Sequence, residues 1–237
     1  MSRKLAGFLT AALGAGVVAL VAGCGGGQSG HSTKPVTPTV VPTLAPSAVD
    51  SLILAPDVVG DIVGAKLNWA SKPPPGWTSP PVAEIADEGN FECEPLLRPD
   101  NYSIGVVYTA WRNNQYKEDK DTYDHSVFQA VATVADAKAA TQLLANAFTK
   151  RLDPCNNTVI HLKDDKFRWR LQKTDATDTN VRWMATELKD DEVVGWVCAS
   201  EGRAKNNVVL YARVCQYGNG APAAAAILDK ISAKIPG

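Results

Sequence analysis

The sequence predicts an α+β domain with a largely antiparallel sheet and flanking helices. Two observations support this class. Short runs rich in Val, Tyr, Phe and Trp follow one another across polar turns, as hairpin strands of an antiparallel sheet do. Only a few segments place apolar residues at helical spacing, and they are too few to alternate with the strands in a parallel α/β pattern.

The first 23 residues have the features of a secretory signal. Arg3 and Lys4 precede an apolar stretch from Leu5 to Ala22, and small residues lead directly to Cys24. This end resembles a bacterial lipobox, which implies cleavage before Cys24 and acylation of that cysteine with diacylglycerol, carrying chains such as palmitate. We expect a lipid anchor on the extracytoplasmic face of the cell membrane. An uncleaved membrane anchor, or secretion with a free cysteine, are the alternatives.

Residues 24–47 are predicted to be a linker and residues 48–237 a single domain. The linker is rich in Gly, Pro and Thr and has no apolar period. Removing residues 1–23 deletes two cations, so 22 basic and 25 acidic residues remain and the formal charge is -3. A nucleic-acid-binding domain would show a basic surplus, and we therefore expect no nucleic-acid partner.

Along the domain, Pro56 suits the first turn of a short helix that Gly64 ends. Thr133 with Asp136 resembles a capping box that opens a longer helix, which Pro154 is expected to end. The last helix is expected over 222–235. Strands are expected over residues 102–111, 125–133, 158–162, 167–171, 181–188, 193–199 and 208–215.

An even number of cysteines in an exported domain predicts two disulfides, with three connectivities open. The four cysteines of the domain are Cys93, Cys155, Cys198 and Cys215. A two-residue turn at Asn206-Asn207 would make Lys205 face Val208 and, seven steps out, Cys198 face Cys215. Gly202 would then lie in the middle of a strand. A turn at residues 201–203 would spoil this register. Cys93 with Cys155 follows by elimination.

Several segments carry a family resemblance in the same order. They are the lipobox, the Pro/Thr linker, Leu52-Ile53-Leu54-Ala55-Pro56 with Gly64, Cys93-Glu94-Pro95, Val127-Phe128 to Phe148, Cys155, Cys198, Asn207-Val208-Val209 and Cys215. Together they resemble the PknH-type extracellular sensor domain of actinobacterial serine/threonine kinases, which also occurs on stand-alone mycobacterial-type lipoproteins. The resemblance covers residues 48–237. It implies the bridges Cys93–Cys155 and Cys198–Cys215, and an antiparallel sheet with helices and a cleft for an unidentified ligand. Leu152 departs from the tryptophan expected three residues before the second cysteine.

No motif of catalytic chemistry stands out in the sequence. It has no Gly-x-Ser-x-Gly, His-Glu-x-x-His or Cys-x-x-Cys pattern and no phosphate-binding glycine loop. Disulfide bonding would remove every domain thiol as a nucleophile. His125 and His161 have no second ligand at metal spacing, and Asp119, Asp121 and Asp124 lack the glycine and glutamate of a calcium loop. We expect no catalytic residue, metal or cofactor.

Candidate ligand-binding residues are aromatic, because aromatic side chains line clefts as well as cores. The weak candidates are Trp111, Trp169, Trp183, Trp196 and Tyr211. Core packing is the alternative for all five. Arg168, Arg170 and Arg182 lie on one polar strand face, where they form either an anion-binding patch or a solvated surface paired with acidic residues.

These observations predict a non-catalytic, sensor-like domain of a cell-envelope lipoprotein. Its partner would be an unidentified small ligand or an envelope protein outside the membrane. The alternative is an envelope enzyme that acts on cell-wall or lipid substrates, with a site assembled from residues distant in sequence. A carboxylate pair in one groove would favour the enzyme, and a surface without a concave pocket would favour a purely structural role.

Overall fold

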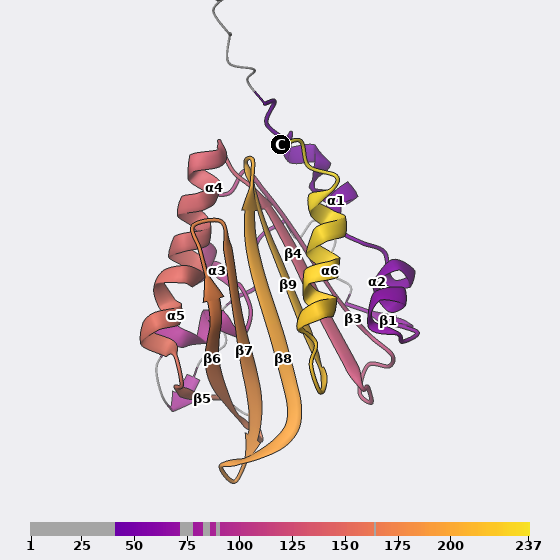
Figure 1. Cartoon of the computed structure of the whole chain (residues 1–237), viewed down its shortest axis with the longest axis vertical. Helices are drawn as coiled ribbons and strands as arrows, with labels where there is room; N and C mark the ends of the chain where they lie inside the picture. Colours follow the sequence, from indigo (N-terminus) through magenta and orange to yellow (C-terminus); the bar gives the residue numbers. More distant parts are fainter. Residues whose placement is uncertain (1–40, 72–77, 83–85, 89–90, 164) are drawn as a thin grey trace, which may run out of the picture. The chain divides into compact units, whose positions relative to one another are not determined.

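The computed structural model describes residues 41–71, 78–82, 86–88, 91–163 and 165–237. The predicted signal peptide, the predicted lipidation of Cys24 and the predicted linker up to residue 40 lie outside the described residues. The described chain from residue 41 onward belongs to one compact unit. It is an α+β domain with an antiparallel sheet and flanking helices, as the sequence predicted (Figure 1).

Nine strands of the described chain form one sheet in the order β1-β3-β4-β9-β8-β7-β6-β5-β2. Every neighbouring pair is antiparallel. The strands are β1 (Trp69–Ala70), β2 (Ala86–Glu88), β3 (Ala110–Lys117), β4 (His125–Thr133), β5 (Val159–Leu162), β6 (Arg168–Ala176), β7 (Asn180–Lys189), β8 (Glu192–Lys205) and β9 (Val208–Tyr217). The long strands β8 and β9 lie at the centre of the sheet, so side chains on both of their faces belong to the core.

Helices cover both faces of this sheet. They are η1 (Pro46–Ala48), α1 (Val49–Leu52), α2 (Pro56–Val63), η2 (Phe91–Leu96), α3 (Asn101–Ile104), α4 (Ala137–Leu144), the π-helical turn η3 (Ala145–Thr149), α5 (Lys150–Cys155) and α6 (Ala221–Ser232). Figure 1 shows α4 and α5 as one continuous rod, apart from α6.

Alternate residues of β9 belong to two separate cores, because successive side chains of a strand point to opposite faces. Val209 and Tyr211 pack with Phe148 of the α4–α5 rod. Val208 and Leu210 pack against α6 and α1. The first group is called here the rod-side core and the second the α6-side core.

Helix α4 begins with a side-chain cap at Asp136, whose carboxylate accepts a hydrogen bond from Ala139 N at 2.8 Å. Thr133 remains the last residue of β4, so the predicted Thr133–Asp136 capping box is wrong. Pro154 lies inside the last turn of α5 and does not end the helix before it. At α2, Gly64 ends the helix in the left-handed region, as predicted.

The strand predicted over residues 102–111 is wrong for most of its length. Asp100 accepts hydrogen bonds from Tyr102 N and Ser103 N and thereby caps the short helix α3. Strand β3 begins only at Ala110 and continues past the predicted end to Lys117. A local capping box thus outweighed the strand propensity of the Tyr and Val residues in this segment.

The cysteine register follows the predicted turn at Asn206-Asn207. Lys205 lies opposite Val208, and Cys198 lies opposite Cys215 with a Cα–Cα distance of 3.9 Å and a disulfide between them. The second disulfide joins Cys93 of η2 to Cys155 of α5, as expected. Both bridges lie in the rod-side core.

The packed chain begins before residue 48, where the domain boundary was predicted. Leu44 N donates to Asn207 Oδ1 at 2.7 Å, and Asn206 Nδ2 donates to Pro42 O at 2.8 Å. The proline-rich end of the predicted linker therefore runs along the β8–β9 turn and leads directly into η1.

Candidate functional site

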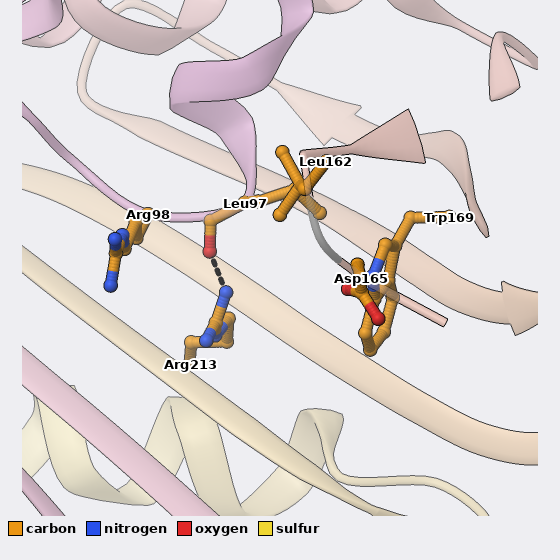
Figure 2. Close-up of a pocket in the computed structure, with 6 residues that line it drawn as sticks. All are labelled: Leu97, Arg98, Leu162, Asp165, Trp169 and Arg213. Carbon is orange, nitrogen blue, oxygen red and sulfur yellow. Dashed lines mark hydrogen bonds between the residues drawn. The ribbon is translucent and has the colours of Figure 1, made fainter. Parts of the chain in front are cut away.

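A cavity of about 170 Å³, called here the Arg213 pocket, opens on the rod-side face of the sheet. Its walls combine charged, aromatic and leucine side chains, shown as sticks in Figure 2. The lining residues are Leu97, Arg98, Leu162, Asp165, Trp169 and Arg213. Three segments far apart in the sequence supply them, so the pocket exists only in the folded domain.

Arg213 and Arg98 form a cationic wall. Arg213 lies on the central strand β9, where its cross-strand neighbours are Phe128 and Ser200. Its guanidinium donates a hydrogen bond to Leu97 O (dashed in Figure 2). Arg98 follows η2, the segment that the Cys93–Cys155 disulfide ties to α5. A central strand and a cross-linked helical turn thus hold the two cations.

The opposite wall is built by the turn between β5 and β6. Asp165 Oδ1 accepts a hydrogen bond from Phe167 N at 3.1 Å, and Oδ2 accepts one from Trp169 Nε1 at 3.1 Å. His161 Nε2 lies 2.8 Å from Asp165 O and donates to it. The carboxylate and the indole are therefore fixed against each other, as Figure 2 shows.

A second carboxylate stands behind this wall. Glu187 of β7 is the cross-strand neighbour of Trp169. Burial raises the pKa of Glu187, and the negative charge of Asp165 raises it further. The two acidic groups are thus within electrostatic reach of each other.

The electrostatics of the cationic wall also reach Tyr211. Burial raises the pKa of the Tyr211 hydroxyl, while the positive charges of Arg213 and Arg98 act in the opposite direction. Tyr211 therefore stays protonated at neutral pH, and its hydroxyl lies 3.2 Å from Ser200 Oγ. Both guanidinium groups are therefore within electrostatic reach of the same buried hydroxyl.

The structure separates the five aromatic candidates. Trp111, Trp183 and Tyr211 are at most 3% exposed and belong to the rod-side core. Trp169 alone of the five lines the Arg213 pocket. Trp196 lies elsewhere, edge-on to the rings of Tyr123 and Tyr217 at centroid distances of 5.9 and 5.2 Å. Core packing explains three of the five, and only one contributes to the site.

The polar strand face carries ion pairs. Arg168 pairs with Asp191, and Arg182 with Glu201 at 3.2 Å. These contacts support the paired surface over the anion-binding patch for these two residues. His125 Nδ1 lies 2.5 Å from Glu118 Oε1. Among the described residues, no cluster of three or more His, Cys, Asp or Glu side chains suits a metal ion.

Sequence reasoning missed five of the six pocket residues. One signal was available for Arg213, since it is a cation inside a strand whose same-face neighbours Tyr211 and Cys215 are apolar and buried. Such a residue in a buried strand marks a place where the core opens. Asp165 carries no comparable signal, because a charged turn is ordinary in a hairpin.

Comparison with known proteins identifies the class of this fold. The PknH-like extracellular domain family matches residues 44–234. The chain is 26% identical over 180 residues to the serine/threonine-protein kinase PknH of Mycobacterium bovis and of Mycobacterium tuberculosis. The match covers 73% of this chain but only 29% and 28% of those kinases, so the chain spans less than a third of their length.

A solved structure shows the same fold. The crystal structure of the extracellular domain of PknH from Mycobacterium tuberculosis superposes with a TM-score of 0.70 at 22% identity, covering 82% of this chain and 100% of that one. The two domains thus share one fold. The chain belongs to the PknH-like extracellular domain family. No helix of the described chain is long and apolar enough to cross a membrane.

Proposed function

We propose that this chain is a lipid-anchored envelope protein whose PknH-like domain binds a small ligand in the Arg213 pocket without converting it. Acyl chains on Cys24 would hold it at the outer face of the cell membrane. The observation that carries the binding function is the pocket itself, in which Arg213 of β9 converges with Asp165 and Trp169 of the β5–β6 hairpin on one cavity. A few convergent polar groups within apolar walls are typical of ligand sites.

Binding is better supported than catalysis. Asp165 lies close enough to Glu187 to raise its pKa, so these two carboxyl groups are the candidate pair for an envelope hydrolase. However, both oxygens of Asp165 accept hydrogen bonds within its own hairpin, and Glu187 is not among the residues that line the cavity. This geometry orients a ligand but offers no paired acid and base facing a scissile bond.

The ligand function is tested by native mass spectrometry of the full chain purified from its own envelope. We expect a retained small molecule, which the variant Trp169→Ala loses. Lys138→Ala, an exposed substitution at the start of α4, serves as the matched control and should retain it. A wild-type protein that carries no added mass would contradict binding in the pocket.

The anchor is tested separately. Mass spectrometry of the amino-terminal peptide should show a diacylglyceryl group on Cys24, and the variant Cys24→Ser should leave the membrane fraction. An unmodified cysteine in membrane-associated protein would contradict the lipid anchor but would not affect the assignment of the pocket.

A further inference from the structure

From the arrangement of charges around the Arg213 pocket, we infer that its ligand is a small zwitterion. The anionic group of the ligand would lie at Arg98 and Arg213, and its cationic group at Asp165 and Trp169. The inference rests on the proposed function and adds the chemical class of the ligand.

The separation of charge within the pocket carries the inference. Figure 2 shows the two guanidinium groups on one side of Leu162 and the Asp165 carboxylate with the Trp169 ring on the other. Arg98 and Arg213 keep their positive charge whatever else they contact, because a guanidinium does not deprotonate in proteins. A carboxylate or phosphate at this wall gains charge-assisted hydrogen bonds.

The acidic wall favours a cation for two independent reasons. Asp165 and Glu187 place two carboxyl groups near each other, and a ligand ammonium there would relieve their repulsion. The Trp169 indole, fixed by its hydrogen bond to Asp165, presents an aromatic ring on which an ammonium group binds favourably. A simple anion would be repelled by the negative charge of this wall.

The size of the cavity limits the ligand further. Pockets for drug-sized molecules measure roughly 300–1,000 Å³, whereas the Arg213 pocket measures about 170 Å³. A lipid tail or a glycan chain is too large for it. A short amino acid, or the charged end of a peptide, has both the required charges and a suitable size.

The test compares zwitterions with analogues that carry a single charge. Glycine, β-alanine and γ-aminobutyrate are titrated into the full chain by calorimetry, with butyrate and butylamine as the single-charge partners of the last. We expect one of the three amino acids to bind at least about tenfold tighter than butyrate and butylamine. The indole N–H signal of Trp169, assigned by its loss in Trp169→Phe, should shift during the same titration.

Two charge-removing variants assign the walls. Asp165→Asn keeps an acceptor for Phe167 N but loses the negative charge. It should therefore lower the affinity for the amino acid about tenfold and leave the affinity for butyrate unchanged. Arg98→Gln should lower the affinity for the amino acid and the affinity for butyrate alike. The matched controls Asp178→Asn and Lys138→Gln remove the same charges at exposed positions and should change neither affinity.

Three outcomes overturn the inference. If butyrate binds as tightly as every amino acid, the pocket is a site for simple anions. If butylamine does so, the pocket is a site for cations. Absence of binding by any probe up to about 10 mM, in a protein that retains a ligand after purification from its envelope, rejects zwitterions but leaves the proposed function intact. Absence of both binding and a retained ligand overturns the two proposals together.

Discussion

The side chain of Asn207 holds the backbone of Leu44 at two points. Leu44 N donates to Asn207 Oδ1 at 2.7 Å, and Asn207 Nδ2 donates to Leu44 O at 2.9 Å. The same amide donates to Val134 O at 3.0 Å. Asn207 is 3% exposed, so these hydrogen bonds are sheltered from water. One side chain thus joins the start of the packed chain to the β8–β9 turn and to the end of β4.

We expect Asn207→Ala to lower the free energy of unfolding by about 3 kcal/mol, since it removes three hydrogen bonds worth roughly 1 kcal/mol each. Urea denaturation measures the difference. Asn206→Gly is the matched control, because glycine accepts the positive φ of 51° at the neighbouring turn position and only exposed hydrogen bonds are lost. Equal losses for the two variants would contradict the role given to Asn207.

Gly202 lies within β8, toward its carboxyl end, where the α4–α5 rod approaches the sheet. A Cβ atom there would lie 3.1 Å from Leu144 Cδ1 and 3.3 Å from Phe148 Cδ2. We expect Gly202→Ala to cost about 1–3 kcal/mol of stability through overpacking. The companion variant Leu144→Ala opens space, so the double variant should lose less stability than the sum of the two single ones. Strict additivity in urea denaturation would reject this contact as the cause.

Local turn chemistry explains which parts of the fold were predictable from the sequence. Asn206-Asn207 set the register of β8 and β9, and this register correctly placed Cys198 opposite Cys215. The sequence also indicated Gly202 as a residue within a strand. It could not give the reason, because the approach of Leu144 and Phe148 is a tertiary contact between segments that lie more than fifty residues apart.

The pocket was much less predictable than the sheet. Trp169 was a candidate only because it is aromatic, and four other aromatic residues shared that property. What distinguishes Trp169 is its hydrogen bond to Asp165 and its position beside Leu162. These relationships depend on how the β5–β6 hairpin meets the segment after η2, which no periodicity in the sequence encodes.

Glu201 makes the stability of the domain depend on pH. It is 2% exposed. Burial opposes its ionisation, but hydrogen bonds from Arg203, Arg182 and Asn180 outweigh burial and lower the pKa below the ordinary 4.5. A lowered pKa contributes stability that is present above the unfolded value and is lost as pH falls through the folded one. We expect Glu201→Gln to lose about 3 kcal/mol at neutral pH.

This loss should shrink as the pH falls below 4.5, where the wild-type carboxylate takes up its proton. Urea denaturation of wild type and variant measures the difference between pH 3 and pH 7, in steps of about one pH unit. Glu192→Gln, at an exposed position, is the control and should show no such trend. A pH-independent difference for Glu201→Gln would contradict the charge network.

Glu187 has the opposite effect. Burial and then Asp165 raise its pKa above 4.5, so its stabilising contribution is present below that value and is lost as the pH rises through the folded pKa. We expect Glu187→Gln to raise the free energy of unfolding at neutral pH relative to wild type, and to raise it less at pH near 4. The same variant should weaken the binding of the amino acid that the wild-type pocket binds. A variant that is less stable at neutral pH would contradict the repulsion between the two carboxyl groups.

The two disulfides should contribute unequally to stability. They close loops with sequence separations of 62 residues for Cys93–Cys155 and 17 for Cys198–Cys215. The chain-entropy model gives about 4 and about 3 kcal/mol respectively. Replacing each pair with serines and measuring urea denaturation compares them directly. Of the two pairs, Cys93–Cys155 alone ties η2 to the rod, so its loss should also weaken ligand binding. A larger effect on stability and binding from the loss of Cys198–Cys215 would contradict this prediction.

The β8–β9 turn at Asn206-Asn207 marks the end of the sheet at which the packed chain begins. Leu44 contacts the domain at this turn. At the other end of β8, Val193 lies opposite Leu188 of β7, and Leu188 lies opposite Arg168 at the start of β6. The hairpin that carries Asp165 therefore lies away from the point where the linker joins. The first described residues of the domain and the acidic wall of its pocket are thus separated by most of the length of β8.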